Sequence, residues 1–547
     1  MSNDVNDVLD VAIVGGGVSG VYSAWRLMRD SGPATFGNGG GRPKITVFEG
    51  SERIGGRMLS VTPPGMPSTV CELGGMRFMS RHVIVSSLVQ YFNLATVPFP
   101  VYEADNIAYL RGKVLRLPDL NDPAVIPYNF TDVEKTIVEN TATNMLMYAL
   151  QQIVPNCLGI SYDDLCLEVQ RATFDGKPLR HFGFWNLLAR ILSPDAYAFA
   201  RDTCGYDVIV SNTNAADAIL FILSDFGPNV TYSRCVNGYD QIPQRLAAEF
   251  QAAGGNVTLG AWLRSFDSAT LPDGTNGVSL SFRDGTTVLA RNLVLAMPER
   301  AIELLDHSGS VLDDSRTEVW DLINSVYPIP MFKIFLAYHY PWWQPIGPTQ
   351  GRTLTDLPIR QCYYWGVEPA SPDAPGNSVL LASYDDENSV SFWAGLRKKS
   401  EITEYYEPEP VADAAPGTWG GHKAPREMAE EAHRQIVQMH GVPYAPKPYA
   451  ASYRDWAEDP YGGGINVWKI HADSWSIAQT ILNPRPGIPV YICGEAFSHE
   501  QGWVEGALQT AENMVTQYFG LPSHVPPQPV VAPANPLPGS RIGARVK

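Results

Sequence analysis

The sequence predicts an α/β fold of three domains: one with a parallel sheet and flanking helices, one with a mixed sheet, and one helical. Three observations lead to this prediction. A glycine-rich turn joins a strand to a helix near the start, helical patterning dominates residues 131–230, and strand candidates return between residues 316 and 455. At 547 residues the chain is also too long for one ordinary hydrophobic core.

The glycine-rich turn has the form G-x-G-x-x-G. The apolar run Val11–Val14 leads into Gly15, Gly17 and Gly20, and helical patterning follows from Val18 to Arg29. Missing side chains let the backbone approach a pyrophosphate, and the N-terminus of the helix supplies N–H donors and a positive dipole. The turn therefore predicts a dinucleotide site.

A carboxylate for the ribose stands at the end of the next strand. The run Ile45–Phe48 ends in Glu49, which can accept hydrogen bonds from both ribose hydroxyls. Glu49 lies further from the glycines than the roughly 20 residues of the usual spacing. The glycine-rich segment Ser31–Gly41 explains the excess, because it reads as a loop inserted between helix and strand.

The later elements follow from periodicity and turn residues. The helix candidates are Val133–Gln152, Phe184–Leu192, a segment ending at Phe250 and a segment from Trp503 to about Tyr518. The strand candidates are Ala108–Val114, Asn256–Leu259, Leu293–Met297, Phe332–Tyr338, Cys362–Trp365 and Val379–Tyr384. The predicted helices and the predicted strands thus fall mostly in different parts of the chain.

Composition and charge narrow the class of protein. The net charge of −17 argues against nucleic acid or an anionic membrane as a partner. No apolar run reaches the roughly 18 residues of a membrane-spanning helix. The polar segment Met1–Asp7 does not have the pattern of a signal peptide. Seven scattered cysteines without C-x-x-C spacing predict reduced thiols and no metal site, so we expect a cytoplasmic protein.

Five segments, in order along most of the chain, resemble the flavin amine oxidase family. They are Val14–Arg57, Glu72–Phe78, Leu293–Pro298, Cys493–Ala496 and Gly502–Ala507. The L-amino acid oxidase branch is the closest match, because Arg77 stands where that branch has its carboxylate-binding arginine.

The resemblance implies how the domains are assembled. It predicts a Rossmann-like, discontinuous FAD-binding domain from residues 8–76, 231–315 and 485–521, and a mixed-sheet substrate-binding domain from residues 77–130 and 316–484. Residues 131–230 form the helical domain. Residues 522–547 are a Pro-rich tail, disordered or strapped to the surface.

The resemblance also implies the cofactor contacts. The residues expected to bind FAD are Gly15, Gly17, Gly20, Glu49, Gly56, Arg57, Gly75, Met76, Trp456, Glu495 and Val504. Monoamine oxidases carry a flavin-linked cysteine after a pair of glycines, whereas here Ile465 follows Gly463 and Gly464. We therefore expect FAD to be bound without a covalent link.

In this branch the substrate is held by few side chains. Arg77 and Tyr384 are expected to bind its carboxylate, the Gly502 carbonyl its amine, and Trp503 to wall its pocket. Lys333 interrupts an apolar strand, and the family uses a lysine there to hold a water beside the flavin for oxygen activation. The alternatives are a structural salt bridge for Arg77, a structural tyrosine for Tyr384 and a solvent-facing lysine for Lys333.

The expected reaction is oxidative deamination of L-amino acids by O2, giving 2-oxo acids, ammonia and H2O2. No histidine can be assigned as a general base, and positioning alone can suffice. The alternatives are an amino acid 2-monooxygenase, which yields an amide, and an FAD-binding protein without activity. A polyamine oxidase would leave Arg77 without a carboxylate to bind. We expect a homo-oligomer, dimeric or larger.

The expected preference for particular substrate side chains rests on Glu500, which lies three residues before Trp503. An unpaired carboxylate there would receive the cationic end of L-Arg or L-Lys beside large neutral substrates. If Glu500 is instead a solvent-exposed loop residue, the pocket should favour apolar and aromatic amino acids.

Overall fold

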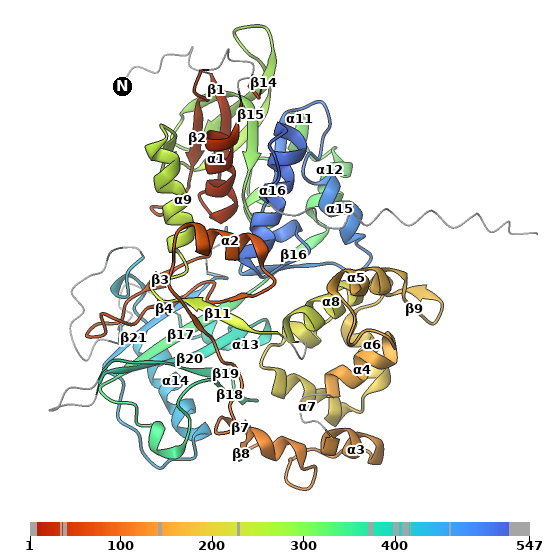
Figure 1. Ribbon diagram of the computed structural model, residues 1–547, viewed down its shortest axis with the longest axis vertical. Helices are drawn as coiled ribbons and strands as arrows, with labels where there is room; N and C mark the ends of the chain where they lie inside the picture. The colour runs from red at the N-terminus through yellow and green to blue at the C-terminus, as the bar shows by residue number, and fades with distance from the viewer. Residues whose placement is uncertain are drawn as a thin grey trace, which may run out of the picture.

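The computed structural model describes most of the chain. The described ranges are 8–32, 35–36, 41–140, 145–226, 230–369, 376–397, 404–406, 415, 417–458 and 461–524. One sheet with its helices occupies the upper half of Figure 1, a second sheet lies at the lower left, and the helices of residues 132–226 lie at the lower right. The α/β prediction is confirmed by the described helices and sheets.

The first sheet joins three separated stretches of chain. In the order β12-β2-β1-β15-β14-β13, with β23 also beside β15, its strands are β12 (Asn256–Thr258), β2 (Ile45–Phe48), β1 (Leu9–Val14), β15 (Thr287–Leu295), β14 (Asn276–Phe282), β13 (Leu263–Thr270) and β23 (Val490–Ile492). β1 lies between β2 and β15 and is parallel to both. All three stretches fall inside the ranges predicted for the FAD-binding domain, whose boundaries stay a prediction.

Both faces of this sheet are covered, which explains its continuous apolar strands. Val11 and Ile13 of β1 pack in the hydrophobic cluster of α1 (Val18–Asp30), α9 (Gln241–Ala252) and α16 (Val504–Phe519). Ala12 and Val14 point to the other face, where the cluster includes α10 (Glu299–Glu303), α11 (Gly309–Leu312) and α12 (Thr317–Ile323). The glycine-rich turn is thereby held at the carboxyl end of a rigid parallel sheet.

The second sheet is mixed and larger than the sequence indicated. In order its strands are β21 (Ala450–Asp455), β17 (Met331–Tyr338), β20 (Ser378–Asp386), β19 (Gln361–Val367), β18 (Arg352–Thr355), β7 (Ile107–Leu110) and β8 (Lys113–Arg116). Only β18 and β7 pair in parallel. Phe332, Ile334 and Leu336 of β17 face α13 (Asn388–Ala394) and α14 (Arg426–Met439). Lys333 lies on the opposite face of β17, by strand alternation.

The helical region contains six α-helices in its described part. They are α3 (Asp132–Asn140), α4 (Met145–Ile153), α5 (Tyr162–Arg171), α6 (Phe184–Ile191), α7 (Pro194–Cys204) and α8 (Ala215–Phe226). The helical patterning predicted over Val133–Gln152 corresponds to α3 and α4, and residues 141–144 between them lie outside the described residues. The other predicted helices match within a few residues.

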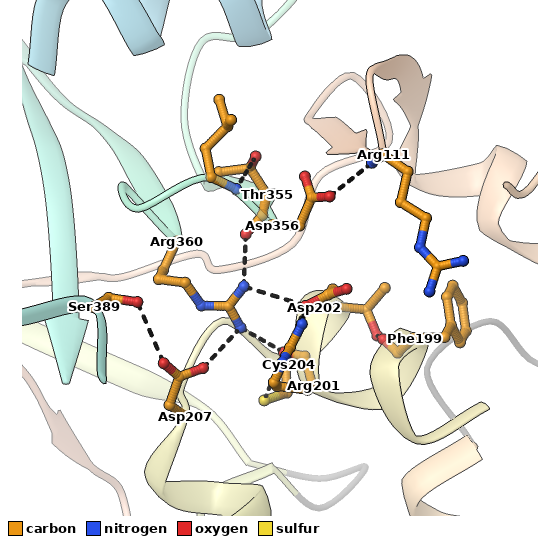
Figure 2. A network of polar contacts seen from close by, with 12 residues as sticks. Arg111, Phe199, Arg201, Asp202, Cys204, Asp207, Thr355, Asp356, Arg360 and Ser389 are labelled. Carbon is orange, nitrogen blue, oxygen red and sulfur yellow. Dashed lines mark hydrogen bonds and ion pairs between the residues drawn. The ribbon is translucent and has the colours of Figure 1, made fainter. Parts of the chain in front are cut away.

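A buried arginine joins this helical region to the second sheet (Figure 2). The guanidinium of Arg360 donates to the Arg201 carbonyl at 2.7 Å and to the Thr355 carbonyl at 2.9 Å. It also lies 3.5 Å from Asp202 and 3.3 Å from Asp207, both of the helical region. Arg360 is 3% exposed, so this charge cluster is shielded from solvent.

Short strands connect the large layers. They are β5 (Phe78–Met79), β11 (Tyr232–Cys235) and β6 (Thr96–Pro98) in one sheet, and the pairs β16 (Val326–Ile329) with β22 (Ile465–Trp468), β3 (Ser60–Val61) with β4 (Cys71–Glu72), and β9 (Thr173–Phe174) with β10 (Lys177–Pro178). β11 pairs with β5 and β6, so its start belongs structurally with the range predicted for the substrate-binding domain.

The start of the predicted tail is tied to the first domain. Arg26 donates to the Pro522 carbonyl at 2.6 Å, and the His524 amide donates to Glu512 at 2.9 Å. Residues 525–547 of that prediction lie outside the described residues. All seven cysteines belong to the described part and are free thiols. Within that part, no helix combines the length and apolar character needed to cross a membrane.

Candidate cofactor and substrate site

A cavity of about 680 Å³ runs from the carboxyl end of the first sheet towards β17 and β20 of the second sheet. Its size is that of a ligand site. The predicted residues that line this main cavity are Gly15, Gly17, Glu49, Gly56, Arg57, Gly75, Lys333, Tyr384, Trp456, Glu495, Gly502, Trp503 and Val504. Gly20, Met76, Arg77 and Glu500 are predicted site residues that do not line it.

The three glycines of the turn serve different steric needs. A Cβ on Gly15, whose φ is +111°, would lie 2.3 Å from the Ala296 carbonyl oxygen. A Cβ on Gly20 would lie 1.9 Å from the Gly15 oxygen, so Gly20 permits close packing of helix on strand. A Cβ on Gly17 would lie 4.0 Å from the Gly56 Cα and would meet nothing closer, and Gly17 caps α1 without a side-chain bond. The unfilled space in front of this N-terminus fits a pyrophosphate.

Glu49 lies at the end of β2, where the sequence predicted a ribose carboxylate. One of its oxygens accepts from the Gly16 amide at 2.6 Å and the other from the Ser51 amide at 2.8 Å. These two bonds orient the carboxylate beside the glycine turn. Each oxygen keeps a second lone pair for a further donor.

The far end of the cavity contains an aromatic and cationic cluster that includes Trp262 and Arg283, two residues that were not predicted. The rings of Trp262 and Tyr461 lie 4.6 Å apart, and the Arg283 guanidinium lies 5.6 Å from each ring. All three line the main cavity. Flat rings and a cation are suited to stacking on a base. With the glycine turn and Glu49, they fit the adenosine part of a dinucleotide such as FAD.

Glu495 organises the site through four donors. It accepts from Arg57 at 2.7 Å and from the Asn466 side-chain amide at 3.0 Å on one oxygen. Its other oxygen accepts from the backbone amides of Asn466 at 3.0 Å and Gly502 at 2.7 Å. We expected Glu495 to bond the cofactor directly. In the structure, its hydrogen bonds with protein donors hold β22, Arg57 and the start of α16 together.

The N-terminus of α16 opens onto the main cavity. Trp503 is its N-cap, Gly502 before it has φ +80°, and both line the cavity with Val504. A Cβ on Gly75 would lie 3.7 Å from the Val504 side chain, which brings the second predicted flavin segment against this helix. A ring system placed here would face the positive end of the helix dipole.

Lys333 is buried at the cavity wall and is not solvent-facing. Its Nζ donates to the carbonyl oxygens of Glu72 at 3.1 Å and Gly74 at 2.5 Å. Burial lowers the pKa of Lys333 to about 7. The ring centroid of Tyr384 lies 4.5 Å from Nζ, so these two predicted residues are brought together.

Arg77 is buried without an ion pair to any described carboxylate. Its guanidinium donates to the Tyr363 hydroxyl at 3.1 Å and the Tyr206 hydroxyl at 3.5 Å. It lies 4.2 Å from the Tyr232 ring and 6.0 Å from the Trp503 ring. The salt-bridge alternative is therefore wrong for the described residues, and Arg77 lies directly behind the cavity wall.

Glu500 is not the unpaired carboxylate that the sequence analysis expected. Arg81 binds both of its oxygens, with Nη2 at 2.8 Å from Oε2 and Nη1 on Oε1. The Glu500 side chain is 5% exposed and the residue does not line the main cavity. An ion-paired carboxylate has no free charge for a substrate cation, so the basic-substrate argument from Glu500 is wrong.

Met76 and Trp456 are two further residues that were expected to bind FAD. Met76 packs in the large hydrophobic cluster and does not reach the cavity with the expected cofactor residues. Trp456 lines the cavity, donates from its indole to the Leu73 carbonyl at 2.9 Å, and lies 4.7 Å from the Arg454 guanidinium. Ile465 lines the cavity as well, and none of the described lining residues is a cysteine.

His422 also lines the cavity and was not predicted. Its Nε2 is buried without a hydrogen-bond partner among the described residues, and burial lowers its pKa to about 4. It belongs to a segment with no recognisable motif, so nothing local in the sequence marked it.

Comparison with known proteins identifies the family of this site. The family model described as flavin containing amine oxidoreductase matches residues 18–517. The chain is 26% identical to aplysianin-A of Aplysia kurodai, over 94% of this chain and 91% of that protein. It is 21% identical to an L-amino-acid oxidase of Siganus canaliculatus, over 94% of this chain and 85% of that protein.

The fold comparison agrees with the sequence comparison. The structure of cyclohexylamine oxidase from Brevibacterium oxydans IH-35A superposes with a TM-score of 0.64 at 17% identity. The match covers 94% of this chain and 99% of that one. At this identity the match concerns the fold alone.

Proposed function

The chain belongs to the flavin-containing amine oxidoreductase family, which implies a flavin cofactor, and from this premise we propose that it oxidises L-amino acids. The products are 2-oxo acids, ammonia and H2O2. The similarity to an L-amino-acid oxidase over most of both chains supports this reading. FAD bound in the main cavity would supply the two-electron oxidation of the substrate, and O2 would reoxidise the reduced flavin.

Arg77 is the observation that carries the proposal. Arg77 is 5% exposed and its hydrogen bonds go only to phenol hydroxyls, so it is a costly buried charge. The Asp225 carboxylate acts on it electrostatically but accepts a hydrogen bond from Tyr232 and forms no ion pair with Arg77. A guanidinium binds a carboxylate through two parallel hydrogen bonds. A substrate carboxylate beside Trp503 would complete this cluster, whereas a simple amine would leave it unpaired.

The remaining residues position the substrate. The Tyr384 hydroxyl has no protein hydrogen bond among the described residues and can share the carboxylate with Arg77. The Gly502 carbonyl can accept from the substrate amine, and Trp503 closes one side of the pocket. Lys333 can hold a water through its remaining N–H, since two of its three donors go to backbone oxygens.

We also propose that the flavin is FAD and that it is held without a covalent bond. The adenosine-sized end of the cavity near Trp262 and Tyr461 supports FAD over a mononucleotide. Ile465 at the expected linkage position, with no cysteine among the described lining residues, supports non-covalent binding. The cytoplasmic location and the homo-oligomer remain proposals that rest on sequence alone.

The test is an assay of products with the FAD-loaded enzyme. L-Leu, L-Phe and L-Lys should each be offered with O2, and H2O2 and 2-oxo acid should form in equal amounts. An amide with CO2 would identify a 2-monooxygenase instead. An enzyme whose yellow colour does not fade with any L-amino acid in the absence of O2 would be an inactive FAD-binding protein.

A further inference from the structure

A second, small cavity lies beside the substrate site. Its volume is about 30 Å³, and it shares Ile465 with the main cavity. Asp217 and Phe221 of α8 line it, one helical turn apart, together with Gln501, the residue before Gly502. A Cβ on Gly502 would lie 3.5 Å from the Ile465 side chain and 3.8 Å from the Phe221 ring. Ile465 and Phe221 therefore lie between Gly502 of the main cavity and the small cavity that they line.

Asp217 is a carboxylate without a counter-ion. Its Oδ2 is buried and has no hydrogen-bond partner in the described part of the chain. Burial raises the pKa of Asp217 to about 7; the Ser474 hydroxyl opposes this rise and the Asp473 carboxylate adds to it, and no cation contributes. Glu495 and Glu500, the other acids near the pocket, are paired with Arg57 and Arg81.

The polar neighbours of Asp217 are already engaged. The Asn214 amide donates to the carbonyls of Lys469 at 3.2 Å and Ala472 at 3.1 Å. Gln501 donates to the Ala496 carbonyl at 2.6 Å and accepts from the Trp468 amide at 3.1 Å. Neither side chain can turn towards Asp217 without breaking these bonds. The hydroxyls of Thr213, which also lines the cavity, and of Ser474 are two further polar neighbours, and neither bonds Oδ2, so a ligand or water in the cavity can supply its donor.

The lining and the volume of the small cavity suit the end of one kind of side chain. Its apolar lining residues are Val208, Ile209, Ala218, Phe221, Ile465 and Val467. Apolar walls suit a polymethylene chain, and a carboxylate at the end suits a cation on that chain. The volume of about 30 Å³ exceeds the roughly 10–15 Å³ that one water needs, so a group of the size of an ammonium fits.

We propose that Asp217 receives the terminal ammonium of a long basic L-amino acid, L-lysine being the model substrate, and sets the side-chain preference of this enzyme. The inference rests on the proposed oxidation of L-amino acids and adds its substrate class. The α-carboxylate goes to Arg77, the stem passes between Phe221 and Ile465, and the ammonium pairs with Asp217. A buried ion pair of this kind discriminates strongly against a neutral chain, because the neutral chain leaves the acid unpaired.

The test compares L-lysine with L-norleucine, which has the same stem without the ammonium. Asp217→Asn keeps the shape and removes the charge, so kcat/KM for L-lysine should fall at least about tenfold while that for L-norleucine changes by less than about threefold. Asp217→Glu restores the charge and should regain part of the activity on L-lysine. Asp163→Asn, an exposed acid on α5, is the matched control and should change neither.

The outcomes separate this inference from the proposed function. Suppose that L-norleucine is oxidised and that Asp217→Asn lowers kcat/KM equally for both substrates, or for neither. Asp217 then does not recognise the side chain, and only this inference fails. If the wild-type enzyme oxidises L-norleucine but not L-lysine, the same conclusion holds. If it oxidises no L-amino acid, the proposed function fails first. The flavin content of each variant, measured after gel filtration, shows whether it folded.

Discussion

The ammonium of Lys333 lies 3.1 Å from the backbone oxygen of Glu72, while the carboxylate of Glu72 is turned away from it. That carboxylate accepts from the Ser60 hydroxyl at 2.7 Å and the Tyr239 amide at 2.8 Å. Lys333 is thus buried with carbonyl acceptors and without a salt bridge in the described residues. This environment accounts for its lowered pKa, since burial disfavours the cation more than the Glu72 carboxylate favours it, and the Arg77 charge adds to the lowering.

Lys333→Met should slow the reaction with O2 and leave the oxidation of substrate largely intact. A lysine is charged below its pKa, so the cation at Lys333 is lost as pH rises through about 7. The wild-type rate of reoxidation by O2 should therefore fall across that pH range. Stopped-flow measurement of the two half-reactions checks this, and an oxidative half-reaction that is equal in variant and wild type would remove Lys333 from oxygen chemistry.

Arg77→Lys should weaken substrate binding far more than cofactor binding. Lysine keeps the charge but loses the fork that binds a carboxylate at two points, so KM should rise by roughly 10- to 100-fold. FAD content should stay normal, because Arg77 does not line the main cavity. Steady-state kinetics with L-Leu and FAD titration provide the two measurements. A KM close to that of the wild type would take Arg77 out of the substrate site.

Local patterns were enough to predict much of the fold. The glycine turn, β17 and α16 were found because period, turn glycines and β-branched runs act over a few residues. The same reasoning could not find the pairing of Arg81 with Glu500, since these residues are 419 positions apart. Sequence shows a charge at Glu500 but not whether another segment neutralises it.

The parts of the site without a motif were missed for a related reason. Trp262 and His422 reach the cavity from segments without a motif, and only the tertiary fold brings them to it. Asp217 lies in the first turn of α8, where an acid is common because it interacts favourably with the helix dipole. Its unpaired state became visible only with the neighbouring helices and β22 in place.

FAD should leave the protein on acid denaturation. With Ile465 at the expected linkage position and no cysteine among the described lining residues, the cavity offers no thiol for a flavin bond. Precipitation in acid should give colourless protein and a yellow supernatant whose absorbance accounts for all bound FAD. Yellow precipitate after washing would contradict this, and a mass spectrum of the digested protein would then locate the linked residue.

Arg360→Met should destabilise the joint between the helical region and the second sheet. The variant leaves Asp207 without its cation in a buried position, while Asp202 keeps Arg201 at 2.8 Å, a loss on the order of 3 kcal/mol. Arg264, exposed and paired with Asp306, is the matched control, and Arg264→Met should cost at most about 1 kcal/mol. Calorimetry should show a clearly lower melting temperature for Arg360→Met alone; equal melting temperatures would mean that the cluster of Figure 2 is not a stabilising joint.

Glu500→Gln should act on the pocket as a whole and not on substrate choice. The substitution removes the charge that pairs with Arg81 and so loosens the segment that leads into Gly502 and Trp503. We expect a loss of stability of about 1–3 kcal/mol, because Arg81 is partly exposed and can be solvated. The values of kcat/KM for L-lysine and L-norleucine should fall by the same factor, in contrast to Asp217→Asn. A loss confined to L-lysine would return the recognition of the cation to Glu500, since a purely structural change in this segment cannot distinguish two substrates that share one stem.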